Sequence, residues 1–273
     1  MKINNHRLWL NDQNPAEFRS SPNHAGVLDA RYLVIHFTAG RNKESSVQWF
    51  LNPNADASAH LVIGRDGTIT QMVPFDKIAW HAGASRWEGL DRLNRYSIGI
   101  ELDNAGKLTY QNEKWMTWFG GTIPKEEVLL AQHKDGSLEA GWHMYTPEQL
   151  ESLVQVAVLL VKNYKLKDVI GHDDISPFRK SDPGPAFPMA SFNAKVMGRN
   201  EDEMPVFETT TRLNIRQGPG VVFLTLPESP LDKGIQMNIL QTKNGWHMVD
   251  ILSEVNQEHG LQGWVNGNYI KRV

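Results

Sequence analysis

The feature that most constrains the fold of this 273-residue chain is a change of pattern near residue 200. Before that point, short β-prone runs alternate with segments of helical period, which is typical of an α/β domain. After a polar link at about 199–205, only short β-prone runs and glycine turns follow, and these predict a small all-β barrel. We therefore expect an α/β domain at 1–200 and a β-barrel at 206–273.

The first domain contains several elements that its sequence predicts individually. The β-prone runs lie at 32–36, 60–64, 68–73, 97–102 and 168–172. The clearest helix begins after Thr146, a threonine N-cap followed by proline, and continues with one apolar face to residue 164. A shorter helix is predicted at 45–51 with serine as its N-cap. The segment 106–145 shows no clean period, and we predict a long loop with a short helix there.

Composition excludes several classes of function. The chain has no cysteine, so disulfides, zinc-thiolate sites and thiol catalysis are excluded, and a metal must bind to His, Asp or Glu. With 28 Lys and Arg against 31 Asp and Glu, it lacks the basic excess of a nucleic-acid binder. The N-terminus has no apolar run of signal-peptide type, and the longest apolar stretch, 154–161, is too short to span a bilayer. We expect no Sec export, no membrane insertion and no obligate protein partner.

Two histidines and one aspartate form the strongest candidate site. His36 and His172 each end a β-prone run, and Asp182 follows ten residues after His172 in a proline-rich loop. Strand ends are where side chains converge on a cleft. Two imidazoles and one carboxylate predict an open zinc site that leaves one position for water. Zinc would lower the pKa of that water to about 7.

Further polar residues could complete a hydrolytic site. Glu101 stands in an otherwise apolar strand, where an unpaired carboxylate is costly, so we expect it to act as a base. Lys180 lies two residues before Asp182, and its ammonium group could stabilise an oxyanion. Asp173 and Asp174 follow His172 directly and are candidates for orienting imidazoles.

These residues stand in strings that together resemble the type 2 N-acetylmuramoyl-L-alanine amidases. The strings are YLVIHFTA at 32–39, SAH at 58–60, RDG at 65–67, WHAG at 80–83, SIGIE at 97–101, GHDDISP at 171–177 and RKSDPGPAF at 179–187. The family includes phage amidases, cytosolic muropeptide-recycling amidases and animal peptidoglycan recognition proteins. The resemblance implies a mixed central β-sheet flanked by helices.

The resemblance also implies roles for the candidate residues. His36, His172 and Asp182 would bind one zinc ion, and Glu101 and Lys180 would assist catalysis. The reaction would cleave the amide bond between the lactyl group of N-acetylmuramic acid and L-alanine of the stem peptide. The partner implied is therefore peptidoglycan or a muropeptide.

Four further residues of these strings are candidates for contact with the substrate. Phage members carry a tyrosine directly before the histidine that matches His60, whereas this chain has Ala59, so we expect Glu101 to take the larger catalytic role. The candidates for substrate contact are His60, His81, Trp80 and Arg65. For the histidines a hydrogen-bonded structural position is the alternative, and for the tryptophan the alternative is burial.

The C-terminal region is similar to bacterial Src-homology-3-like domains. The similarity lies in LNIRQGPG at 213–220, GW at 245–246, GWV at 263–265 and YI at 269–270. In wall hydrolases such domains often bind peptidoglycan. A second attachment site would raise the effective concentration of the catalytic domain at its polymer.

The sequence leaves the form of the substrate open. The string DPGPAF at 182–187 and the missing signal peptide favour soluble anhydromuropeptides and action in the cytoplasm. The appended barrel favours polymeric wall, reached after holin-type release or specialised export, and this endolysin-like hypothesis is the one we prefer from sequence. A non-catalytic recognition module is the alternative of another class. Many such binders lack the third metal ligand, whereas this chain retains Asp182.

Overall fold

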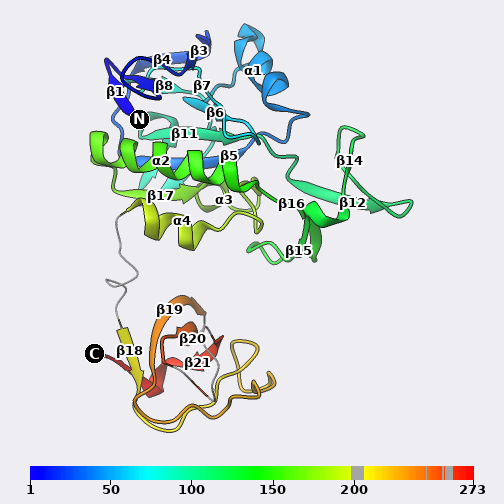
Figure 1. Cartoon of the computed structure of the whole chain (residues 1–273), viewed down its shortest axis with the longest axis vertical. Helices are drawn as coiled ribbons and strands as arrows, with labels where there is room; N and C mark the ends of the chain where they lie inside the picture. The colour runs from blue at the N-terminus through cyan, green and yellow to red at the C-terminus, as the bar shows by residue number, and fades with distance from the viewer. Residues whose placement is uncertain (198–205, 244, 254, 256–260) are drawn as a thin grey trace. The chain divides into compact units, whose positions relative to one another are not determined.

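The computed structural model describes residues 1–197, 206–243, 245–253, 255 and 261–273. The chain divides into two compact units, Met1–Gly198 and Arg199–Val273 (Figure 1). Each unit has its own hydrophobic core. The predicted polar link at 199–205 lies outside the described residues.

A six-stranded mixed sheet forms the centre of the first unit (Figure 1). Its order is β17 (Asp168–Gly171), β5 (Tyr32–Phe37), β11 (Ser97–Leu102), β6 (Leu61–Ile63), β7 (Ile69–Gln71) and β3 (Glu17–Phe18). The first four strands run parallel, and β7 turns back antiparallel to β6. The nearly continuous apolar runs of β5 and β11 are buried, as parallel strands covered on both faces require. The predicted mixed α/β architecture is confirmed.

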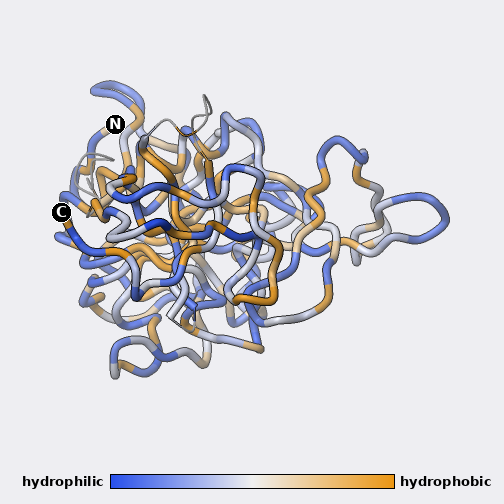
Figure 2. Tube along the Cα trace, turned by 90° about the horizontal axis from the view of Figure 1, so that it is seen from below, coloured by the Kyte–Doolittle hydropathy of each residue, from blue (hydrophilic) through white to orange (hydrophobic). Residues whose placement is uncertain are grey.

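The helices of this unit include the long amphipathic helix that the sequence predicts. They are α1 (Lys43–Leu51), α2 (Pro147–Tyr164), α3 (His172–Ile175) and α4 (Met189–Val196). At the start of α2 the Thr146 side chain accepts a hydrogen bond from the Gln149 amide at 3.2 Å. The apolar face of α2 buries Leu153 and Leu160 in the core beside the sheet. Figure 2 shows hydrophobic and hydrophilic stretches alternating along the chain.

Two predicted element boundaries are wrong. The first helix begins at Lys43, because the Asn42 side chain accepts a hydrogen bond from the Ser45 amide at 2.8 Å and so takes the capping role predicted for a serine. The strand predicted to end in histidine stops at Gly171, and His172 is the first residue of α3.

The segment 106–145 forms a second sheet, so the predicted long loop is wrong. This antiparallel sheet, called the excursion sheet below, has the order β14 (Thr122–Ile123), β13 (Lys114–Met116), β12 (Lys107–Gln111), β16 (Ala140–His143) and β15 (Val128–Ala131). A short 3-10 helix, η3 (Lys125–Glu127), precedes β15. The excursion sheet projects beside the central sheet (Figure 1).

Side chains near the turns of the excursion sheet contact the segments that follow β5 and β17. The indole nitrogen of Trp118 donates a hydrogen bond to the carbonyl oxygen of Ala39, just after β5, at 2.6 Å. After β15, Nε2 of His133 and Nζ of Lys134 lie 3.0 and 2.7 Å from the carboxylate of Asp173, just after β17. The excursion sheet is therefore attached beside the ends of two neighbouring strands.

The remaining elements of the first unit are short. They are the strand pairs β1 (Lys2–Asn4) with β2 (Arg7–Trp9), β4 (His24–Val27) with β8 (Lys77–Ala79), and β9 (Arg86–Trp87) with β10 (Leu90–Asp91), and the 3-10 turns η1 (Pro53–Ala55) and η2 (Leu93–Arg95). None of the helices in the described part of the chain combines the length and apolar character needed to cross a membrane.

The second unit is β-rich, as its sequence predicts. Its five strands, in sheet order, are β21 (Gln262–Asn266), β20 (Trp246–Ile251), β19 (Gln236–Lys243), β18 (Val206–Thr209) and β22 (Ile270–Arg272), with η5 (Gly267–Tyr269) before the last. Neighbouring strands are antiparallel and enclose a core that includes Ile215, Val249 and Val265. The closed barrel and the Src-homology-3-like relationship stay predictions.

Candidate active site

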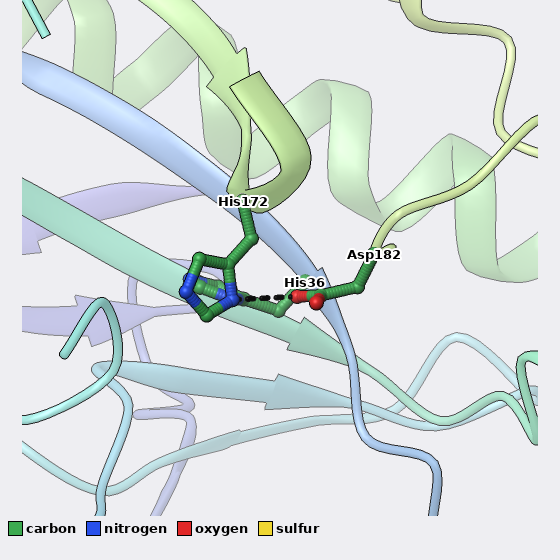
Figure 3. Close-up of side chains that lie close together, drawn as sticks. All are labelled: His36, His172 and Asp182. Atoms are coloured by element: carbon green, nitrogen blue, oxygen red, sulfur yellow. Dashed lines mark hydrogen bonds and ion pairs between the residues drawn. The ribbon is translucent and has the colours of Figure 1, made fainter. Parts of the chain in front are cut away.

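Three side chains from separate segments converge on one point in the first unit. His36 comes from β5, His172 from the start of α3 and Asp182 from the following loop, and Figure 3 shows them pointing toward one another. Nδ1 of His36, Nδ1 of His172 and Oδ2 of Asp182 are each 2.9 Å from the other two atoms. All three side chains are buried. The three residues predicted as metal ligands thus form one cluster that could hold a metal ion.

Parallel strand pairing explains why these residues meet. β17 and β5 lie side by side in the sheet, so the residues at their carboxyl ends reach the same edge. The loop that carries Asp182 is held against α3 by a hydrogen bond from the Asp173 amide to the Asp182 carbonyl oxygen at 2.8 Å. The hydroxyl of Tyr145 donates to the next carbonyl, that of Pro183, at 2.8 Å. The loop is therefore fixed at the residue that faces the two imidazoles.

The hydrogen-bond network assigns the proton of each imidazole. Nε2 of His172 lies 3.1 Å from the carbonyl oxygen of Ala82, so this nitrogen carries the hydrogen and donates it. Nε2 of His81 lies 3.2 Å from the carbonyl oxygen of Ser97 and donates in the same way. Nδ1 of His81 is then an acceptor for Nε2 of His36, at 2.9 Å. Nδ1 of His36 and of His172 therefore each present a lone pair to the cluster.

Three electron-pair donors thus face one another with no hydrogen between them. Burial, and then the neighbouring His172, lowers the pKa of His36 to about 4, so its ring is neutral at pH 7. Burial raises the pKa of Asp182, but the adjacent imidazoles lower it by more, and the carboxyl stays ionised. Such a cluster is repulsive unless a cation lies within it. Its donors suit a zinc ion, with ligand bonds of about 2.0–2.2 Å, so the residues present fit this metal.

Glu101 lies beside this cluster. In the register of the parallel strands β5 and β11, Glu101 pairs with His36. Its Oε2 atom is buried and accepts no hydrogen bond from the described residues. Burial and, to a smaller extent, the charge of Asp182 raise the pKa of Glu101 well above its usual range, and Lys180 opposes this shift. A raised pKa suits a carboxyl group that exchanges a proton near neutral pH.

A known protein family matches the part of the chain that carries this site. The sequence pattern of the N-acetylmuramoyl-L-alanine amidase family, Amidase_2, matches residues 26–185, more than half of the chain. That range contains the three cluster residues together with Glu101 and Lys180. The chain belongs to this amidase family.

Individual relatives within the amidase family are moderately similar. The 1,6-anhydro-N-acetylmuramyl-L-alanine amidase AmpD of Escherichia coli (strain K12) is 38% identical over 141 residues, which is 51% of this chain and 58% of that protein. The N-acetylmuramoyl-L-alanine amidase AmiD of the same organism is 31% identical over 185 residues, which is 64% of this chain and 56% of that protein. The chain therefore spans less than two thirds of these relatives' lengths. A crystal structure of a selenomethionine AmpD derivative superposes with a TM-score of 0.50 at 31% identity, covering 72% of this chain and 99% of that one.

A cavity of about 610 Å³ opens over the cluster in this amidase-family domain. Its walls include the three cluster residues together with Glu101 and Lys180, so it brings together all five residues predicted for metal binding and catalysis. Its volume lies in the range of small-molecule sites, which is about 300–1,000 Å³. Lys180 is half-buried in this wall. A substrate that enters the cavity therefore meets both a carboxyl group and an ammonium group beside the cluster.

Two of the four residues predicted to contact substrate line the cavity, namely Trp80 and His81. Trp80 is half-buried. His81 also accepts a hydrogen bond from Nε2 of His36, and this bond fixes the tautomer of His36. No sequence pattern indicates this relay, because His36 and His81 stand in separate strings, at 32–39 and 80–83.

The other two residues predicted to contact substrate, His60 and Arg65, lie away from the cavity wall. His60 is fully buried, and its ring accepts a hydrogen bond from the Gly99 amide and donates one to the Lys77 carbonyl, at 3.0 and 2.9 Å. Arg65 donates to the Met144 carbonyl at 2.9 Å and pairs with Glu127 of η3 at 2.8 Å. Both side chains hold parts of the fold together, and neither is among the described residues that line the cavity.

Asp173 and Asp174, the candidates for orienting the imidazoles, make other contacts. Their carboxylates pair with Lys134 of the excursion sheet at 2.7 and 2.5 Å. Asp174 also accepts a hydrogen bond from the Gly171 amide at 2.7 Å, which closes the first turn of α3. Among the described contacts, carbonyl oxygens and His81 orient the imidazoles instead.

Proposed function

We propose that this protein is a zinc-dependent N-acetylmuramoyl-L-alanine amidase. The observation that carries the proposal is the convergence of three lone pairs, from His36, His172 and Asp182, in a cavity that also exposes Glu101. Membership of the amidase family over this part of the chain supports the same reaction. The bond cleaved would be the amide between the lactyl group of N-acetylmuramic acid and L-alanine.

The roles of the protein's own groups follow from their chemistry. Zinc, when bound by the cluster, would supply a Lewis acid that makes water nucleophilic at neutral pH. Glu101 accepts the proton that water loses as it adds to the carbonyl carbon. The same carboxyl then donates this proton to the L-alanine nitrogen as the C–N bond breaks. Lys180 stabilises the negative charge on the carbonyl oxygen. The products are the lactyl carboxylate and a peptide with a free amino group.

We infer further that the substrate is a soluble 1,6-anhydromuropeptide. Relatives such as the AmpD proteins of Escherichia coli and Citrobacter freundii, at 38% and 36% identity, carry this substrate in their names. These relatives favour the recycling alternative over the wall polymer that we prefer from sequence alone. The second unit is the feature that favours the wall, and its binding to peptidoglycan is a separate hypothesis.

A comparison of two substrates tests both levels of the proposal. The purified, zinc-loaded protein is incubated with a soluble anhydromuropeptide or with intact sacculi, and peptides with a free L-alanine amino group are quantified by mass spectrometry. We expect release from the soluble substrate at a rate well above that from sacculi. Release from sacculi alone would overturn the substrate assignment. Absence of release from both, with zinc bound, would overturn the amidase proposal in favour of a non-catalytic recognition module.

A further inference from the structure

The turn between β13 and β14 of the excursion sheet presents an exposed tryptophan in a fixed position. Trp118 has 76% of its surface exposed, which is unusual for so large an apolar side chain. Its indole N–H is nevertheless engaged, because it donates to the Ala39 carbonyl oxygen at 2.6 Å. Ala39 lies three residues after His36. The indole is thus held beside the segment that carries a predicted zinc ligand.

The backbone of this turn is also well fixed. The Thr117 amide donates to the Gly121 carbonyl oxygen, and the Gly121 amide donates to the Thr117 hydroxyl, both at 2.8 Å. Gly120 has a φ of 85°, a conformation that glycine adopts without strain. A ligand that binds to this turn would therefore lose little affinity to the ordering of a loop.

Trp118 and its neighbour Phe119 belong to the wall of the same cavity that contains the metal cluster. The two rings meet edge to face, with centroids 5.7 Å apart and planes at 82°. The guanidinium group of Arg41 lies 5.8 Å from the Phe119 centroid and also lines the cavity. The excursion sheet therefore supplies an aromatic section of the cavity wall.

We propose that Trp118 and Phe119 form a subsite for the saccharide ring of the substrate. This inference rests on the proposed amidase function. It goes further by naming the sugar ring as the part of the substrate that the excursion sheet binds. Since the indole N–H already has an acceptor, Trp118 offers a ligand its flat apolar face. The bicyclic ring of a 1,6-anhydromuramic sugar carries C–H groups, including the methylene of its bridge, that can pack against such a face. The first residues of the stem peptide are small or charged and present no comparable surface.

The kinetic test compares variants of Trp118 with a matched control. Trp118→Ala removes the face, whereas Trp118→Phe keeps an aromatic face and loses the N–H. Tyr110 of β12 is 59% exposed and is not among the described residues that line the cavity, so Tyr110→Ala is the control. On a soluble anhydromuropeptide we expect Trp118→Ala to raise KM about three- to tenfold with kcat within about twofold, a loss equivalent to one aromatic contact. Trp118→Phe should lie between native and Trp118→Ala, and Tyr110→Ala should match native.

A binding measurement separates this inference from the amidase proposal. 1,6-Anhydro-N-acetylmuramic acid and the dipeptide L-alanyl-γ-D-glutamate are each titrated into the full zinc-loaded chain, while the indole N–H resonance of Trp118 is followed by NMR. That resonance is assigned from its loss in Trp118→Phe. We expect the sugar to shift it and the dipeptide to leave it in place. A shift with the sugar in a protein without amidase activity would support the subsite and overturn the function. An active protein with an unmoved resonance and an unchanged KM in Trp118→Ala would overturn the subsite alone.

Discussion

Glu101 of β11 stands in register with His36 of β5, so a carboxyl group whose buried Oε2 accepts no hydrogen bond from the described residues lies on the strand next to a predicted zinc ligand. The two residues are far apart in the sequence, and the parallel pairing of their strands alone brings them together. The proposed proton-transfer group and a predicted zinc ligand therefore lie on adjacent strands of one sheet.

Because Glu101 lies beside the predicted zinc ligands but is not one of them, its substitution should change catalysis without changing zinc binding. Glu101→Gln keeps the size of the side chain and removes its ability to carry a proton. We expect kcat to fall by about 10²–10⁴-fold, the usual contribution of general acid–base catalysis, while the zinc content stays at the native level. Kinetics and metal analysis by mass spectrometry on the same preparation check this. Loss of zinc from Glu101→Gln would show that the carboxyl acts in metal binding instead.

Removal of a predicted metal ligand should lower the zinc content as well as the activity. In His172→Ala we expect loss of both zinc and activity, because only two donors of the cluster remain. In the native protein a chelator should lower the melting temperature, because an ion that binds only the folded state stabilises it and its removal leaves three facing lone pairs. The melting temperature of His172→Ala should not respond to chelator. An equal response in both proteins would place the metal elsewhere.

The hydrogen-bond relay through His81 predicts an effect on metal affinity. His81→Phe preserves an aromatic ring and removes the acceptor for Nε2 of His36, so the tautomer of His36 is no longer fixed. We expect zinc affinity to fall about 10–100-fold, as measured by competition with a chelator of known affinity. Ser97→Ala is the control, because the carbonyl oxygen of residue 97 is the acceptor for His81 and survives the change. An equal loss in the two variants would contradict the relay.

His60 predicts a dependence of stability on pH. Burial lowers the pKa of His60 to about 4, so the unfolded chain takes up this proton near pH 6.5 and the folded chain only near pH 4. Its contribution to stability is therefore fully present above pH 6.5 and is lost as the pH falls toward 4. The slope in that window is about 1.4 kcal/mol per pH unit.

The variant His60→Gln isolates this contribution, because its side chain does not titrate. We expect it to be less stable than the native protein at neutral pH, since two buried hydrogen bonds are disturbed. The difference should narrow as the pH falls toward 4, as measured by denaturant unfolding at several pH values. A constant difference across that range would contradict the predicted proton uptake.

Much of the central domain could be predicted because its elements carry local signals. Thr146 and Pro147 mark the start of α2, and the apolar runs of β5 and β11 mark buried strands. His36 and His172 were found because a polar residue at the end of an apolar run stands out. The rule that parallel strands end at one edge of a sheet brings the two histidines together. The position of Asp182 depends instead on the loop contacts made by Asp173 and Tyr145.

The excursion sheet could not be predicted by the same reasoning. β12 is exposed at four of its five residues, so its sequence shows neither alternation nor an apolar run. Its pairing with β16 depends on contacts between segments far apart in the chain. The position of His60 was missed for a related reason, because a buried histidine bonded to backbone groups has no local sequence pattern of its own.

Two of the contacts that attach the excursion sheet, those of Trp118 and Lys134, have a consequence for local unfolding. Trp118 holds the segment after His36, and Lys134 holds the segment after His172, so one peripheral element restrains both histidines. Transient detachment of this element would release both restraints in a single cooperative event. Zinc that requires both histidines would oppose that detachment, and amide hydrogens of the excursion sheet would then exchange more slowly as the metal occupancy rises.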